Sequence, residues 1–312
     1  MLQNVSLRFL RHLAKDNLKE TALSKLKHWT KQFSSNKVLE PETSAALIVA
    51  HALNKKMFVE LDSHEKQQPL THQQIKLIDN LARKRLQKIP IQYIIKEWDF
   101  SGLTLKMRPP VFIPRPETED LVQFVSDEIL TNSATSVLHL LEVGCGSGAI
   151  SLAVIKSEKI KSNKTDINFT CIDCNQSAVN LTKENMMLVD VNQTKMQAIH
   201  TDIALLPTNQ MFDGIVSNPP YIPSKEMGDL QAEIYQNESH LALHGGYDGL
   251  DVVRKILDAS KSVLKPGGWI WLEVDDSHPK IIPNILPEQF AFVEMREDIF
   301  GNPRFVKIIK KS

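Results

Sequence analysis

The spacing of hydrophobic residues changes twice along the chain and divides it into three parts. Up to about residue 92, apolar residues recur roughly every 3.6 positions, most clearly over residues 45–53, and this spacing predicts helices. Pro41 and Thr71 have the sequence context of helix starts, and Pro90 ends the last of these helices. We therefore expect residues 1–90 to form a small all-α domain. Before residue 40 it has eight Lys/Arg against two acids, a bias that fits a partner- or substrate-binding surface but is more often that of a solvated helix face.

The second part is short and contains two different signals. Alternating apolar residues between 92 and 108 predict a β-hairpin that turns at Ser101-Gly102. Four prolines between 109 and 116 follow, and this stretch cannot lie inside a sheet because proline has no amide hydrogen to donate. Residues 91–116 are therefore expected to form a β-hairpin and a proline-rich connector, with a helix from Glu117 to Leu130 after them.

The third part alternates short apolar strands with helices. The strands are expected at residues 137–143, 167–173, 197–202, 212–217, 269–274, 290–295 and 304–309. The helices are expected near residues 148–157, 175–188, 228–236, 249–264 and 279–286. This alternation predicts an α/β domain over residues 117–312, with a mainly parallel, doubly wound, seven-stranded sheet.

Composition excludes several classes of protein. The formal net charge is zero, which argues against a protein built mainly to bind a nucleic-acid backbone. No apolar run approaches the roughly 20 residues that a membrane span needs, so no membrane partner is expected. Cys171 and Cys174 have CxxC spacing, but no second CxxC or histidine pair completes a zinc site, and no metal is predicted. Cys145 is the only other cysteine, and three cysteines do not make a disulfide framework, so they indicate a reducing compartment.

The first fifteen residues are basic and amphipathic. They contain Arg8, Arg11 and Lys15 and no acidic residue. Their apolar side chains include Leu2, Val5, Leu7, Phe9, Leu10 and Leu13. This pattern fits an organellar transit segment, and it fits the first helix of the helical domain equally well.

A glycine-rich loop joins the first strand of the α/β domain to a helix. Glycines let the backbone turn sharply and approach a ligand closely, and the following helix presents free N–H groups to that ligand. Ala149 also fits the looser dinucleotide-binding pattern, so the loop alone does not separate NAD from S-adenosylmethionine. The candidate cofactor-binding residues here are Glu142, Gly144, Cys145, Gly146, Ser147 and Gly148.

Two later acids narrow the cofactor. Asp173 ends the next strand, where its carboxylate can accept hydrogen bonds from both ribose hydroxyls, and Asp202 ends the third strand, where it can accept from an adenine amino group. Ile203 is placed to pack on the adenine ring. Each acid could instead cap a helix, but their order after the loop favours an adenosyl ligand.

The tetrapeptide Asn218-Pro-Pro-Tyr221 follows the fourth strand, at the sheet edge where open α/β folds bind ligands. The Asn218 amide carries an acceptor and a donor, and the proline carbonyls are free to accept. Such a group of acceptors suits a planar –NH2 group, with Tyr221 packed against it. The alternative is a strand-ending turn with a buried tyrosine, which the upstream loop disfavours. The tetrapeptide therefore indicates methylation of an amide or exocyclic amine, with Asn218, Pro219 and Tyr221 as catalytic candidates.

These motifs resemble the HemK/PrmC-type protein N5-glutamine methyltransferases, which modify the Gly-Gly-Gln motif of peptide-chain release factors. The resemblance covers most of the chain. Its motifs are Phe112-Ile-Pro-Arg115-Pro-Glu-Thr118, the Gly144 loop, Asn218-Pro-Pro-Tyr221, Leu241-Ala-Leu-His-Gly-Gly-Tyr-Asp-Gly-Leu250, Leu272-Glu273-Val-Asp and Gly301-Asn-Pro-Arg304. Two positions depart from the family pattern: Lys96 stands where glycine is usual, and Ser239 where proline is usual.

The resemblance implies a class I (Rossmann-like) S-adenosylmethionine-dependent methyltransferase fold, S-adenosylmethionine as cofactor, and a release factor as protein partner. It implies that Phe112, Arg115 and Thr118 wall or anchor the cofactor pocket. It also implies that the substrate glutamine is bound by the tetrapeptide Asn218, Pro219, Pro220 and Tyr221.

The amino-acid sequence around the Gly144 loop and Glu273 resembles that of the animal mitochondrial branch of the family. This resemblance favours the mitochondrial matrix over the cytoplasm as the location. Two alternatives have a different activity. A nucleic-acid adenine-N6 methyltransferase uses a similar tetrapeptide, but it must extract its base and usually needs a basic groove, which zero net charge disfavours. A non-catalytic adapter is disfavoured because the loop, both acids and the tetrapeptide are all present.

Overall fold

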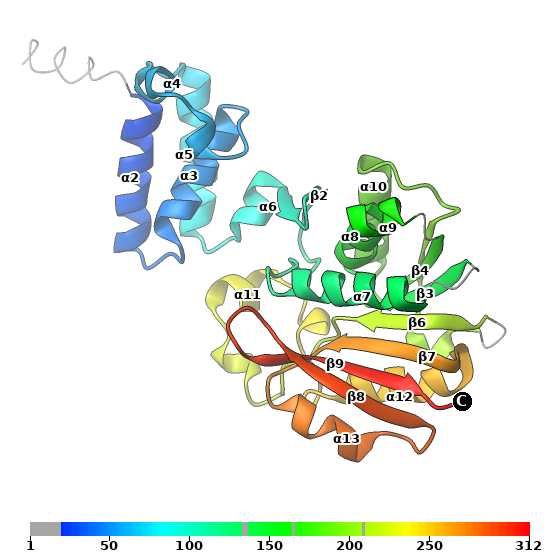
Figure 1. Ribbon diagram of the computed structural model, residues 1–312. Helices are drawn as coiled ribbons and strands as arrows, with labels where there is room; N and C mark the ends of the chain where they lie inside the picture. The colour runs from blue at the N-terminus through cyan, green and yellow to red at the C-terminus, as the bar shows by residue number, and fades with distance from the viewer. Residues whose placement is uncertain (1–19, 133–136, 164–165, 208–209) are drawn as a thin grey trace, which may run out of the picture. The chain divides into compact units, whose positions relative to one another are not determined.

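The computed structural model describes residues 20–132, 137–163, 166–207 and 210–312. The basic segment that contains Arg8, Arg11 and Lys15 lies outside these residues. The chain divides into two compact units, which meet in sequence between Ile95 and Lys96 (Figure 1).

The described part of the first unit is helical, as expected. Its helices are α2 (Ala22–Ser35), α3 (Pro41–Ala52), the 3-10 turn η1 (Phe58–Glu60), α4 (Ser63–Gln67), α5 (His72–Leu86) and α6 (Ile91–Ile95). Thr71 caps α5: its hydroxyl accepts from the Gln74 backbone N–H at 3.2 Å, and the Gln74 side chain accepts from the Thr71 N–H at 2.9 Å. The core buries Phe33, Ile48 and Ile78 completely. Helix ends and apolar faces therefore follow directly from the local sequence.

The predicted hairpin has the right turn and the wrong start. Strands β1 (Glu97–Phe100) and β2 (Leu103–Lys106) pair around Ser101 and Gly102, whose φ angles of 46° and 78° are those of a tight hairpin turn. Residues 91–95, however, are helix α6, because Ile91, Ile94 and Ile95 have helical spacing and are buried in the helical core.

The second unit contains the predicted seven-stranded sheet, in the order β5-β4-β3-β6-β7-β9-β8. The first five strands in that order are parallel and the last two pairings are antiparallel. The strands are β3 (Leu138–Val143), β4 (Ile167–Asp173), β5 (Met196–His200), β6 (Phe212–Ser217), β7 (Leu264–Glu273), β8 (Phe290–Glu297) and β9 (Pro303–Lys310).

Helices cover both faces of this sheet (Figure 1). On one face lie α7 (Thr118–Asn132), α8 (Ala149–Lys156), α9 (Glu158–Ser162) and α10 (Gln176–Leu188). On the other lie α12 (Asp251–Val263) and α13 (Ile282–Ile285). The short elements between strands are α11 (Ala232–Asn237) and the 3-10 turns η2 (Ile203–Leu205), η3 (Met227–Asp229), η4 (His240–Ala242) and η5 (His278–Lys280).

Two predicted helices are shorter than expected. The helix expected at residues 228–236 is reduced to α11 because the backbone of Leu230 is extended and interrupts it. The helix expected at residues 279–286 divides into η5 and the one-turn α13, whose Pro283 cannot continue a longer helix. Among the residues that the structure describes, none of the helices is both long and apolar enough to cross a membrane.

The sheet topology locates the site. Strand β3 lies between β4 and β6. Successive strands are added on one side of β3 up to β5 and on its other side from β6 onwards, so the strand order reverses at β3. A crevice forms at the carboxyl edge of an open sheet where the order reverses in this way. The glycine loop after β3, Asp173 at the end of β4 and Asn218 after β6 all lie at that edge.

Candidate active site

Two cavities meet at the carboxyl edge of the sheet. The larger has a volume of about 420 Å³, and the smaller about 130 Å³. Both are lined by Asn218, together with Phe112, Pro220 and Ala242. Asn218 is therefore the polar side chain that the two cavities share.

Most of the predicted cofactor residues line the larger cavity. They are Phe112, Thr118, Glu142, Gly144, Cys145, Gly146, Ser147, Asp173, Asp202, Ile203 and Asn218. Gly148 does not line it and instead begins helix α8. Arg115, Pro219 and Tyr221 line the smaller cavity. The sequence motifs thus gather in one place, and the cavity volume lies in the range typical of small-molecule sites.

The glycine loop is bound to the next strand by Asp173. The Gly146 N–H donates to Asp173 Oδ2 at 3.0 Å, and the Asn175 N–H donates to Asp173 Oδ1 at 2.8 Å. Asn175, not Asp173, caps helix α10, because its side chain accepts from the Ser177 N–H at 2.9 Å. Each Asp173 oxygen keeps a free lone pair for a hydroxyl donor in the cavity. Burial raises the pKa of Asp173, while its two backbone hydrogen bonds favour the ionised form.

Asp202 has a structural and a cavity-facing role. Its Oδ1 accepts from the Ala204 N–H at 2.9 Å and so caps η2, which confirms the capping alternative for this residue. Its Oδ2 lies 3.5 Å from Lys255 Nζ, a pair that also lines the larger cavity. The neighbouring Ile203 is 5% exposed and presents an apolar wall.

Glu142 lies below the glycine loop and is buried. Its Oε2 accepts from the Ser151 N–H at 3.2 Å and from the Ser151 hydroxyl, and the Cys171 thiol is 3.7 Å away. Burial raises the pKa of Glu142 to about 7, although the hydrogen bonds oppose this shift. Cys171 is thereby part of the packing beneath the loop.

The Asn218 amide has a defined orientation. Its Nδ2 donates to the Thr118 hydroxyl at 3.2 Å, which leaves Oδ1 as the acceptor end. The strand before it is anchored because the Ser217 hydroxyl donates to the Val143 carbonyl at 2.7 Å. Tyr221 follows in the smaller cavity, where burial, and then the charge of Glu273, raise the pKa of its phenol. Tyr221 is therefore neutral and suited to packing.

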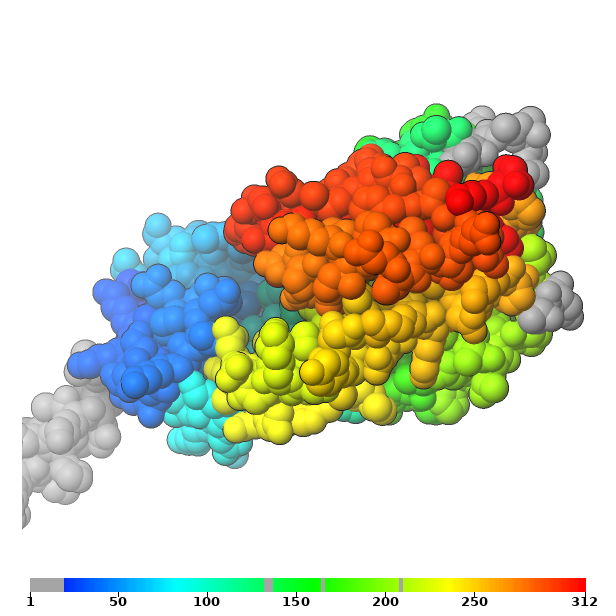
Figure 2. Space-filling model, turned by 90° about the horizontal axis from the view of Figure 1, so that it is seen from below, coloured from blue at the N-terminus to red at the C-terminus, as the bar shows by residue number. Residues whose placement is uncertain are grey.

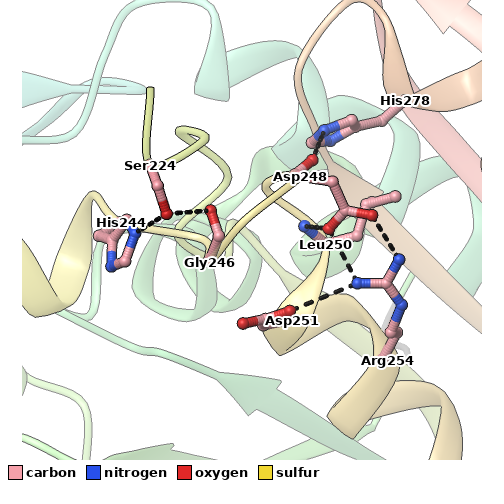
Figure 3. Close-up of polar contacts among 8 residues, drawn as sticks. All are labelled: Ser224, His244, Gly246, Asp248, Leu250, Asp251, Arg254 and His278. Atoms are coloured by element: carbon pink, nitrogen blue, oxygen red, sulfur yellow. Dashed lines mark hydrogen bonds and ion pairs between the residues drawn. The ribbon is translucent and has the colours of Figure 1, made fainter. Parts of the chain in front are cut away.

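The loop of residues 243–251, here called the strap, lies alongside residues 222–224, which directly follow the tetrapeptide. The Ile222 N–H donates to the Leu243 carbonyl at 3.0 Å, and the Gly245 N–H donates to the Ile222 carbonyl at 2.9 Å. Ser224 continues the pairing: its hydroxyl donates to the Gly246 carbonyl at 3.0 Å and accepts from His244 Nε2 at 2.8 Å (Figure 3). The strap therefore supports the tetrapeptide from one side.

The strap itself is fixed by α12 and η5. Arg254 donates to Asp248 Oδ1 at 2.8 Å, and His278 Nε2 donates to the Asp248 carbonyl at 3.0 Å (Figure 3). Figure 2 shows the same neighbourhood from outside, with the yellow residues near 240 packed against the orange residues near 280. Gly246 and Asp251 of the strap also line the larger cavity.

Arg115 was expected to wall or anchor the cofactor pocket, but it does not line the larger cavity. It forms an ion pair with Glu238 instead. Its guanidinium stacks on Phe112 at 4.8 Å and donates to Glu238 Oε1 at 2.7 Å. Glu238 Oε2 accepts from the Ile113 N–H at 3.2 Å. Ser239 adds a backbone bond to the Pro110 carbonyl at 3.0 Å, which the proline usual in the family could not donate.

Sequence reasoning assigned no role to Glu238, to the strap or to Glu273. The strap and Glu273 could have been found from the sequence, because the glycine-rich run Leu241–Leu250 and the Leu272-Glu273 segment both belong to the family's motifs. What was missing was their position beside Asn218 and Phe112.

A Rossmann-like sheet with a glycine loop, two acids that line the larger cavity, and an Asn-Pro-Pro-Tyr corner defines a methyltransferase that acts on a planar –NH2 group. Comparison with known proteins agrees with this class. Residues 124–247 match the methyltransferase small domain, and residues 24–95 match the PrmC N-terminal domain.

Several curated relatives match nearly the whole chain. The MTRF1L release factor glutamine methyltransferase of Homo sapiens is 40% identical over 92% of this chain and 87% of its own. The release factor glutamine methyltransferase of Thermodesulfovibrio yellowstonii is 33% identical over 93% and 98%, and that of Streptococcus pneumoniae 31% over 86% and 91%. The chain belongs to the release factor glutamine methyltransferase family and is an S-adenosylmethionine-dependent enzyme.

The residues present fit that cofactor. The free lone pairs of Asp173 suit ribose hydroxyls, and the apolar Ile203 beside Asp202 suits an aromatic ring that carries an amino group. Gly146 has φ of 56° and no atom within 4 Å of where a Cβ would stand, so the loop backbone is open to a ligand.

Proposed function

We propose that this enzyme methylates the side-chain nitrogen of the glutamine in the Gly-Gly-Gln motif of a peptide-chain release factor. The observation that carries the proposal is the place of Asn218, whose amide lies where the cofactor-sized cavity and the smaller cavity meet. A glutamine side chain entering the smaller cavity would bring its nitrogen to that point. The names of the curated relatives support a release factor as the substrate.

The chain's own residues act by positioning. A carboxamide nitrogen is a weak nucleophile because its lone pair is delocalised, so alignment with the methyl group is the main task of the enzyme. Asn218 Oδ1 and the Pro219 carbonyl accept the two amide hydrogens. These acceptors favour the positive charge that grows on nitrogen over the neutral ground state. Tyr221 packs against the amide and restricts its rotation.

The cofactor, when bound, supplies a methyl group whose bond to sulfur breaks as a bond to the glutamine nitrogen forms, with the electron pair kept by sulfur and one amide proton lost to water. Asp173, Asp202 and Ile203 would hold its adenosyl part, while Phe112 and Thr118 wall the cavity. No residue has to remove a proton before the transfer, because the nitrogen becomes strongly acidic only afterwards.

The partner and location follow from the same family. We infer that the helical residues 1–90, together with α6, contact the release factor. The rest of residues 91–116 would then connect them to the methyltransferase domain at 117–312. The resemblance of the Gly144 loop and the Glu273 segment to the animal mitochondrial branch supports a mitochondrial matrix location, with which the basic, acid-free first fifteen residues are compatible. Zero net charge supports a protein substrate without direct nucleic-acid or membrane contacts.

Mass spectrometry of the reaction products tests the proposal. The full chain is incubated with S-adenosylmethionine and either a mitochondrial release factor or a matched protein whose Gly-Gly-Gln is changed to Gly-Gly-Asn. One methyl group on the glutamine nitrogen, absent from the matched protein, is the expected result. Methylation of adenine in added DNA or RNA, with the release factor unmodified, would overturn it.

A further inference from the structure

Glu273 lies beside Asn218 because of the strand register. Strands β6 and β7 are parallel, and the last residues that pair between them are Ser217 and Leu272. The next residue on each strand is Asn218 and Glu273 respectively, so these two leave the sheet edge as neighbours. Glu273 is 1% exposed, which makes it one of the few fully buried acids of the second unit. A buried carboxylate at this place needs a function or a partner.

Thr118 completes a chain of three polar groups. The Asn218 Nδ2 donates to the Thr118 hydroxyl at 3.2 Å, and Thr118 is itself 1% exposed. A hydroxyl has one proton to donate, and having accepted from Asn218 it directs that proton to another acceptor. Thr118 and Asn218 both lie beside the Glu273 carboxylate, and each lowers its pKa. An ionised carboxylate only accepts, so it can face the NH2 end of the Asn218 amide but not its oxygen.

We propose that Glu273 is a positioning residue that, together with the Thr118 hydroxyl, holds the Asn218 amide with Oδ1 towards the substrate. An asparagine amide has two ends of nearly equal size and opposite hydrogen-bonding character. Turned by half a rotation, Asn218 would present donors to the donors of the substrate amide and could not align it. The inference rests on the proposed function, because it concerns the same substrate nitrogen.

The protonation state of Glu273 matters for this role. Burial raises its pKa to about 7, while Thr118, Arg304 and Asn218 lower it and Glu117 raises it further. The neutral phenol of Tyr221 also faces this group. Glu273 Oε2 has no hydrogen-bond partner among the described residues. A proton there turns an acceptor-only group into a donor, which removes the preference for one orientation of Asn218. Methyl transfer should therefore slow as the pH falls through about 7.

The test compares Glu273→Gln with the wild-type full chain, using a release factor as substrate. Glutamine keeps the shape but has its own two interchangeable ends, so it no longer imposes an orientation on Asn218. We expect kcat to fall about 10- to 100-fold above neutral pH, with unchanged affinity for S-adenosylhomocysteine. We also expect the decrease in rate below pH 7 to disappear. Glu128→Gln is the matched control, because Glu128 pairs with Lys307 at 2.5 Å and lines neither cavity.

The outcomes separate the two claims. A Glu273→Gln enzyme with wild-type kcat and an unchanged acid limb would overturn the role of Glu273. A wild-type enzyme that does not modify the release factor at all would instead refute the proposed function. If Glu273→Gln does not fold, Thr118→Val removes the bridging hydroxyl at nearly the same volume. Its kcat should then fall by a similar factor, and full kcat in that variant would also overturn the inference.

Discussion

Replacing Gly249 with alanine tests whether the strap supports the tetrapeptide. Gly249 has φ of 79°, in the left-handed region, and a Cβ there would lie 2.3 Å from the Tyr221 carbonyl oxygen and 2.8 Å from His278 Cε1. No side-chain rotation relieves a contact with a backbone oxygen. Either the strap or Tyr221 must therefore move by several tenths of an ångström.

Gly102 provides a matched control within the same unit. It has almost the same φ, 78°, but no atom lies within 4 Å of its added Cβ. Gly102→Ala should cost only the left-handed strain of about 1–2 kcal/mol. Gly249→Ala should add an overpacking cost of about 1–3 kcal/mol to that strain. The difference between the two variants thus isolates the contacts of position 249 with Tyr221 and His278.

Urea unfolding and methyl-transfer kinetics measure the two consequences. We expect Gly249→Ala to lose more free energy of unfolding than Gly102→Ala. We also expect its kcat to fall by up to about 100-fold, because a displaced Tyr221 carbonyl shifts the acceptors of the substrate amide. Equal losses of stability in the two variants, with kcat unchanged in both, would refute the reasoning.

Three further predictions use other parts of the second unit. Asn218→Ala should reduce kcat at least about 100-fold with cofactor affinity nearly intact, whereas Asp173→Ala should mainly weaken cofactor binding measured by calorimetry; the reverse pattern would exchange their roles. Burial raises the pKa of Glu142 to about 7, above its unfolded value, so its contribution to stability is complete below about pH 4.5 and is lost as the pH rises through 7. Urea unfolding should show that the free energy of unfolding falls less between acidic and alkaline pH in Glu142→Gln than in the wild type. An identical fall in both would show that Glu142 is not the group responsible. Lys96 has φ of 64°, so Lys96→Gly should raise the free energy of unfolding by up to about 1 kcal/mol, and a decrease would show that its side chain contributes more than the strain costs.

Local features were predictable because they depend on neighbouring residues. The strand ranges 167–173 and 212–217 agree with the structure at both ends, since each is a mainly apolar segment that ends at a polar residue. Thr71 was recognisable as a helix start from its own capping sequence. The start of the hairpin was missed because Ile91–Ile95 fits both an alternating and a helical pattern, and only packing against the helical core decides between them.

Site residues divide in the same way. The glycine loop, Asp173, Asp202 and the Asn218 tetrapeptide were identifiable because their chemistry lies in short motifs at the ends of strands. Arg115 was assigned to the cofactor pocket, whereas its partner is Glu238, 123 residues away in sequence. No local pattern indicates such a pair.

The sequence by itself therefore determined the class of fold, the cofactor and the tetrapeptide that grips an amide, because periodicity and motif chemistry are properties of short segments. Only the tertiary structure decided how that tetrapeptide is held. Asn218 meets Thr118 across 100 residues of sequence, and it meets Glu273 because β6 and β7 are adjacent and in register. Contacts of this kind depend on the order of strands in the sheet, which brings distant residues together at one edge.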